Sequence, residues 1–190
     1  MTDEDPAMPD RLLATLRRLN RGVAILIGVL LFGCAGFVLL DIALRQAGSS
    51  FGGTDEISGY VMAIATSWGM GYALLELGHV RIDLVRSRAG SLGRALFDLF
   101  SMLVLALTVA LIAFKCWPVL ERSLTVGSRA NTPLETPLWL VQLPWFAGWV
   151  WFALMAWLTF AAALALVVQG RFSAAEAAIG AFGEEQEVAS

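Results

Sequence analysis

The chain has 190 residues, of which 58% are hydrophobic and only 15% are charged, and its formal net charge at pH 7 is −3. Soluble domains are typically about 25% charged, so this composition excludes an ordinary soluble domain and predicts one integral membrane bundle. The apolar runs are long and continuous, which excludes an outer-membrane β-barrel, because barrel strands alternate between apolar and polar residues.

Residues 1–21 are predicted to be a cytoplasmic tail followed by a short helix. Leucines recur at helical spacing between Asp10 and Arg21, and the charges of this segment are arginines: Arg11, Arg17, Arg18 and Arg21. The pattern favours an amphipathic helix that lies on the membrane surface near anionic lipid. The same arginines could simply be a positive flank that orients the next span, and both interpretations stay open.

We predict an all-α integral membrane protein whose domain of residues 22–168 has four transmembrane helices, at about 22–44, 55–77, 95–117 and 138–168. The first span is too long for the apolar region of a cleaved signal peptide. It ends at Asp41 and Arg45, whose i, i+4 spacing predicts an ion pair.

The second span holds a stripe of small residues. Ile57 to Leu75 carries no charge and measures about 28 Å at ~1.5 Å per residue, close to the ~30 Å of a bilayer core. Small residues at four-residue spacing let helices approach closely in lipid, so we predict helix packing along this stripe. Its members are Gly59, Ala63, Ser67 and Gly71.

An aspartate and two prolines bear on where the third and fourth spans begin, bend and end. Asp98 lies one turn into the third span and is expected to pair with Arg94, although a charge inside a span is also a functional candidate. Pro118 is expected to end this span. The uncharged run from 138 to 168 would be about 46 Å of helix, so we expect it to tilt or to bend at Pro144. An acidic cytoplasmic tail follows at 169–190.

Arginines set the predicted orientation. They gather on the N-terminal flank and between the second and third spans, where the chain has Arg81, Arg86, Arg88 and Arg94. Positive residues favour the cytoplasmic side, so both termini are predicted to be cytoplasmic.

The chemistry-bearing residues are few. The one histidine, His79, cannot supply paired haem ligands, and no zinc cluster or catalytic motif is present in the sequence. We therefore predict no catalytic, cofactor or metal site, no enzyme activity and no nucleic-acid partner. The polar turn after the second span, with His79, Arg81 and Asp83, either contacts a partner or merely caps the helix.

The sequence resembles the small permease (DctQ-type) subunit of TRAP transporters, the tripartite ATP-independent periplasmic carriers. The matching features are Arg45 after the first span, Asp55 and Glu56 opening the second, Trp68 with Gly69 and Gly71 within it, and the turn Gly78-His79-Val80-Arg81-Ile82-Asp83. Two positions depart from the family pattern: Gln46 replaces an aromatic residue, and Gly53-Thr54 stands where a tryptophan often precedes the acid.

The resemblance implies a scaffold in the bacterial inner membrane. Its partners would be membrane lipid, a large permease subunit that carries the sodium and substrate sites, and a periplasmic binding protein that delivers a solute such as an organic acid. Arg45, Asp55 and Glu56 would help to dock the binding protein, and the turn with His79, Arg81 and Asp83 would contact the large subunit. Two alternatives are a membrane anchor of a redox enzyme and a small self-contained oligomeric transporter.

Overall fold

The structure, a computed structural model, describes residues 8–78 and 86–180, and it is helical throughout these two ranges apart from short connections. Within the described residues, β-pairing is limited to one isolated antiparallel bridge between Arg129 and Pro137. The helices are α1 (Met8–Gln46), α2 (Thr54–Leu75), the 3₁₀ turn η1 (Arg86–Arg88), α3 (Ser91–Val126), α4 (Leu138–Val168) and α5 (Phe172–Ile179).

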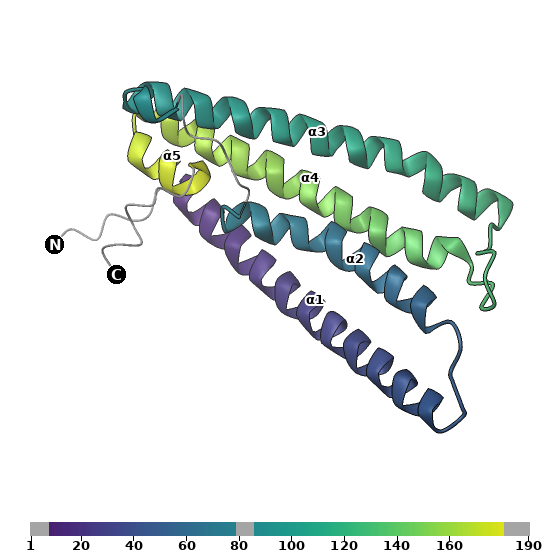
Figure 1. The fold of residues 1–190 in the computed structure, drawn as a ribbon. Coiled ribbons are helices and arrows are strands. Elements are labelled where there is room, and N and C mark those ends of the chain that lie inside the picture. Colours follow the sequence, from purple (N-terminus) through teal and green to yellow (C-terminus); the bar gives the residue numbers. More distant parts are fainter. Residues whose placement is uncertain (1–7, 79–85, 181–190) are drawn as a thin grey trace.

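The long helices run up and down in chain order and share two ends (Figure 1). At the α5 end, α1 and α3 begin, α2 and α4 finish, and α5 lies across them. At the loop end, the connections 47–53 and 127–137 join the helices. α3 and α4 lie side by side along their length, whereas α1 diverges from its neighbours towards the loop end.

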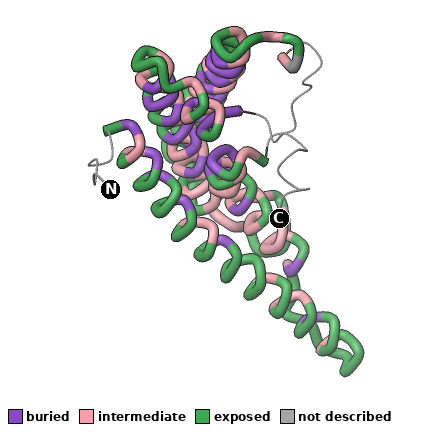
Figure 2. Tube along the Cα trace, turned by 90° about the vertical axis from the view of Figure 1, so that its left-hand side faces the viewer, coloured by how far each residue is buried: buried purple, intermediate pink, exposed green. Residues whose placement is uncertain are grey.

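The core lies between α3 and α4 and continues under α5. Met102 and Ala106 of α3 are fully buried against Phe152 and Ala156 of α4. Small side chains at such contacts let two helix backbones approach closely. At the α5 end the same cluster takes in Ile179, which is 1% exposed, so the short last helix is part of the packed core. Figure 2 shows burial concentrated at this end and exposure along the far end of α1.

α1 is one continuous helix of 39 residues, so the expected separate helix over residues 10–21 is wrong as a separate element. Its leucines face the bundle: Leu13 and Leu16 are buried against residues of α2, α4 and α5. Gly22, at the expected break, destabilises a helix by only about 1 kcal/mol, and no proline accompanies it. The tertiary contacts of Leu13 and Leu16, before Gly22, therefore stabilise α1 as one continuous helix.

α3 also runs further than expected. Pro118 lies inside the helix, which ends only at Val126, so a helix end at Pro118 is wrong, while the end of the third membrane span stays a prediction. A proline removes one backbone hydrogen bond, and helices of membrane proteins tolerate this because neighbouring groups re-satisfy the backbone. The helix stops instead at Gly127, whose left-handed backbone (φ 66°) caps it.

Three of the described helices, α1, α3 and α4, are long and apolar enough to cross a membrane. α4 begins and ends at the residues expected for the fourth span and contains Pro144. α2 is not among the three, because serine, threonine, tyrosine and glycine dilute its apolar residues. The count of four spans therefore stays a prediction.

Candidate functional sites at the two ends of the bundle

Asp41 organises the loop end of α1. Its side chain is 1% exposed, and the carboxylate accepts hydrogen bonds from Arg45 Nε at 2.8 Å, from Ser50 Oγ at 2.9 Å and from the Phe51 backbone N–H at 2.8 Å. The predicted ion pair between Asp41 and Arg45 is confirmed. Because one carboxylate satisfies three donors, it fixes the α1–α2 connection and leaves the Arg45 side chain half exposed at its rim.

Replacing Asp41 tests this arrangement. In Asp41→Ala, the donors of Ser50, Phe51 and Arg45 lose their shared acceptor, and we expect a loss of about 1–3 kcal/mol of stability. The loss should be read as a lower midpoint in thermal unfolding of the purified full-length chain. Asp55→Ala is the matched control, because Asp55 is exposed at the same end. Equal midpoints for Asp41→Ala and the wild type would contradict the assignment.

The start of α2 joins the two connections of the loop end. Gly53 has a left-handed backbone (φ 65°), and a Cβ at this position would collide with the Leu134 side chain of the 127–137 connection. Glu56 accepts a hydrogen bond from Tyr60 Oη at 2.5 Å, while Asp55 is exposed. The structure thus brings Asp55 and Glu56 to the same end of the bundle as Arg45.

α2 packs closely on α4 in the middle of the bundle. Trp68 Nε1 donates a hydrogen bond to the backbone carbonyl of Pro144 at 2.9 Å, and the Trp68 ring centroid lies 5.9 Å from that of Trp151. The contact depends on Gly148: a Cβ there would collide with Ser67 and would lie 2.8 Å from Trp68 Cδ1. This glycine therefore sets the separation of the two helices.

Asn20 ties α1 to the same contact. It is fully buried, its Nδ2 donates to the Leu16 carbonyl at 3.2 Å, and its Oδ1 accepts from Trp151 Nε1 at 3.0 Å. A Cβ on Gly71 would lie 2.9 Å from Asn20 Oδ1, so the glycine makes room for the amide. A buried amide with both ends paired gives this three-helix contact a defined geometry.

The predicted small-residue stripe is thus divided along α2. Ser67 and Gly71 are buried against α4 and α1 of the same chain, and Ala63 is half-buried. Gly59 lies near the loop end, and no atom stands within 4 Å of the place that a Cβ would take there, so this part of the stripe is open.

A buried ionic cluster holds α5 against the start of α3. Arg86 of η1 binds Asp98 through two hydrogen bonds, Nε–Oδ1 at 2.8 Å and Nη2–Oδ2 at 2.9 Å, and also binds Glu176 Oε1 at 2.7 Å. The Asp98 side chain is 3% exposed and that of Arg86 is 12% exposed. The expected pair of Asp98 with Arg94 is wrong, since Arg94 Nε instead lies 3.8 Å from Glu176 Oε1.

Two further contacts close the α5 end. Arg171 binds Asp10 with Nη1–Oδ2 at 2.7 Å, and Arg17 donates to the Ala177 carbonyl at 3.4 Å. Asp10 lies outside the predicted spans, and the hydrogen bond from Arg171 holds the pKa of its carboxyl below the ordinary value. These contacts place the start of α1 beside the segment that follows α4. The predicted contact residues His79, Arg81 and Asp83 lie outside the described residues.

Within residues 8–78 and 86–180, no group of three or more His, Cys, Asp or Glu side chains lies close enough together to hold a metal ion. The two cysteines of this part, Cys34 and Cys116, are free thiols. What the described chain presents is a helical membrane protein with packed interhelical contacts and polar groups gathered at its two ends.

The family model described as "Tripartite ATP-independent periplasmic transporters, DctQ component" matches residues 34–165, which is most of the chain. The chain therefore belongs to the DctQ family and is a small membrane subunit of a TRAP transporter. Comparisons with curated proteins and with solved structures gave no match.

Proposed function

We propose that this chain is a four-span scaffold of the bacterial inner membrane that braces a large permease subunit during ion-gradient-driven solute uptake. The observation that supports the proposal best is the combination of the family match with the nature of the interior. Asn20, Arg86 and Asp98 are largely buried polar groups whose partners lie in the same chain, where they serve packing. A rigid body of this kind suits a supporting role beside a partner that moves solute.

The orientation in this proposal has both termini in the cytoplasm. Asp10 and Arg171 bind each other at the α5 end, which supports placing the start of α1 and the segment after α4 on one side of the membrane. The arginines of this end, including Arg86, Arg88 and Arg94, favour the cytoplasmic side. The loop end, with the acidic start of α2, would then face the periplasm.

In this orientation Arg45, Asp55 and Glu56 would help to dock the periplasmic binding protein, which delivers a solute such as an organic acid. The exposed Arg45 guanidinium and Asp55 carboxylate offer charges of both signs. Exposed charge pairs of this kind mainly raise association rates and are screened by salt. The turn with His79, Arg81 and Asp83 would contact the large subunit, which would carry the sodium and substrate sites.

The experiment is co-purification and uptake with a double variant of the turn. An affinity-tagged chain is expressed with the large permease subunit and the binding protein, in the wild-type form and as His79→Ala with Asp83→Ala. We expect the wild type to recover the large subunit and to support uptake, and the double variant to lose most of both. The control, Arg129→Gln at the loop end, should retain them.

Two results would count against the proposal. Unchanged recovery and uptake in the double variant would rule out the proposed contact between the turn and the large permease subunit. Solute movement by the wild-type chain reconstituted without any partner would remove the scaffold role itself.

A further inference from the structure

We propose that the outer face of α1 binds one anionic phospholipid, whose phosphate lies on Arg18 and Arg21 and whose acyl chain lies in a groove beside Gly28 and Gly33. The proposal goes beyond the scaffold role, because the partner is a lipid and the site is built by α1 alone.

The arginines point away from the bundle. With about 3.6 residues per turn, the side of α1 that carries Leu13, Leu16 and Asn20 is the buried side, and these three residues are indeed buried. At about 3.6 residues per turn Arg18 lies opposite this side and Arg21 lies about 60° around the helix from Arg18; both arginines are exposed. Neither makes a hydrogen bond or ion pair with the described part of the chain, so both guanidinium groups are available to an external anion.

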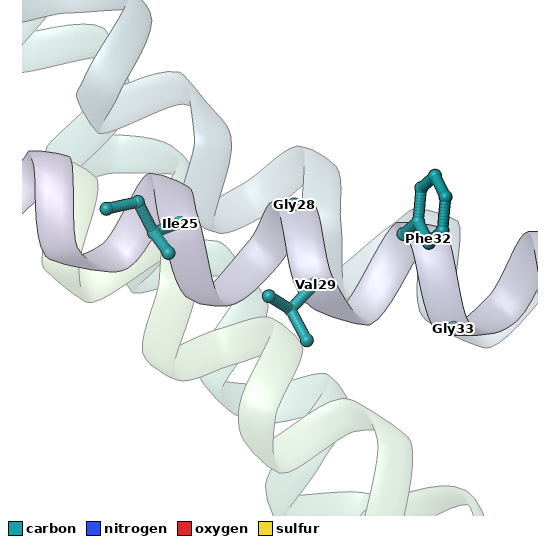
Figure 3. Close-up of a pocket in the computed structure, with 5 residues that line it drawn as sticks. All are labelled: Ile25, Gly28, Val29, Phe32 and Gly33. Carbon is teal, nitrogen blue, oxygen red and sulfur yellow. The ribbon is translucent and has the colours of Figure 1, made fainter.

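A shallow apolar groove continues the same face one turn further along. It is lined by Ile25, Gly28, Val29, Phe32 and Gly33, and Figure 3 shows its three side chains standing out from the helix. Gly28 and Gly33 add no side chain, and no atom lies within 4 Å of where a Cβ would be. The exposed fractions of Ile25, Val29 and Phe32 are 63%, 66% and 84%, so the groove is open to lipid.

The spacing of the two parts fits one leaflet. From Arg21 to Gly33 the helix rises about 18 Å at ~1.5 Å per residue. One leaflet of a bilayer core ~30 Å thick is about 15 Å. A headgroup at Arg21 therefore places its acyl chain along the whole groove.

The charge selects an anionic lipid. Arginine binds phosphate oxygens in a bidentate manner, and a basic residue at an anionic membrane surface contributes about 1 kcal/mol. Asp10, the acidic residue at the start of α1, is already bound to Arg171. A partner helix in the groove would also need an acidic residue placed at the two arginines, whereas one anionic phospholipid supplies both the acyl chain and the anion.

The test is lipid binding by the purified full-length chain. Native mass spectrometry is used to titrate phosphatidylglycerol or phosphatidylcholine into the wild type and into Arg18→Gln with Arg21→Gln. We expect the wild type to prefer phosphatidylglycerol and the double variant to lose affinity for it by roughly thirtyfold, which is about 1 kcal/mol per arginine at ~1.4 kcal/mol per tenfold. Arg122→Gln with Arg129→Gln, two arginines of the loop end, should keep the wild-type affinity.

A second variant tests the groove without changing charge. Gly28→Leu with Gly33→Leu fills it, and we expect weaker binding of phosphatidylglycerol although both arginines remain. Equal affinity of the wild type for the two lipids, or wild-type affinity in the arginine variant, would overturn the proposal. So would a photocrosslinker at Phe32 that captures the large permease subunit in the assembled complex and no lipid. Recovery of that subunit, measured in the same samples, reports separately on the scaffold role.

Discussion

Asp98→Asn is expected to destabilise the chain by about 3–5 kcal/mol, because it removes one partner of a buried ion pair and leaves the Arg86 guanidinium under-compensated. The Asp98 side chain is 3% exposed and takes two hydrogen bonds from Arg86, so solvent cannot replace them. Thermal unfolding of the purified full-length chain should show a clearly lower midpoint. Arg88→Gln is the control, since Arg88 belongs to the same short turn as Arg86 and removes one charge from it.

A double variant separates charge pairing from packing. In Arg86→Met with Asp98→Leu both members of the buried pair are removed together, and Glu176, which loses a partner, has a side chain that is 35% exposed, so we expect a smaller loss than in Asp98→Asn alone. Asp98 holds the Arg86 guanidinium in the position where it also binds Glu176 of α5. Asp98→Asn alone should therefore also loosen α5. A cysteine at Ala178, which is 4% exposed, should then react faster with a thiol reagent in a background without Cys34 and Cys116. An unchanged midpoint and unchanged labelling would show that the cluster does not hold α5.

The second large effect is expected for Gly148→Ala. The added methyl group would collide with Ser67 and approach Trp68 Cδ1 to 2.8 Å, so α2 and α4 must separate. Overpacking of this kind typically costs about 1–3 kcal/mol. The displacement would also stretch the hydrogen bond from Trp68 to the Pro144 carbonyl. The lower stability is measured as a lower unfolding midpoint and as weaker recovery of the large permease subunit.

Two controls make this test specific. Gly59→Ala adds the same methyl group to α2 where no atom lies within 4 Å, and it should leave the midpoint unchanged or raise it slightly, because alanine favours a helix over glycine by about 1 kcal/mol. Ser67→Gly in the Gly148→Ala background removes the side chain that the new methyl meets, and it should recover part of the loss. A midpoint for Gly148→Ala equal to that of Gly59→Ala would refute the close approach of α2 and α4.

Continuous apolar runs made most of the helices predictable. The uncharged run 138–168 coincides with α4, because helix length in lipid follows the absence of charge. Pro118 indicated the wrong helix end, since proline ends helices in water but lies inside α3 here. The change from a basic segment to an uncharged run after Arg21 indicated two helices, but α1 is continuous, because buried leucines before this point pack it against the bundle.

The tertiary pairings could not be predicted from the sequence. The pair of Asp41 with Arg45 could be predicted because i, i+4 spacing places both residues on one helix face. Arg86 and Glu176 are far apart in the chain and meet only because α5 folds back over the start of α3. Asn20 was missed for a similar reason: its partner, Trp151, lies on another helix, and a lone asparagine in a basic segment gives no local signal.

Because α3 continues through Pro118, its last turns extend beyond the predicted end of the third span. From Lys115 to Val126 the helix rises about 16 Å at ~1.5 Å per residue. The polar layer on each side of a bilayer core is only about 5–8 Å thick. If Lys115 marks the edge of the hydrocarbon, the connection after Val126 stands well clear of the phosphates. A soluble protein that binds the 127–137 connection would then do so without contacting the lipid headgroups.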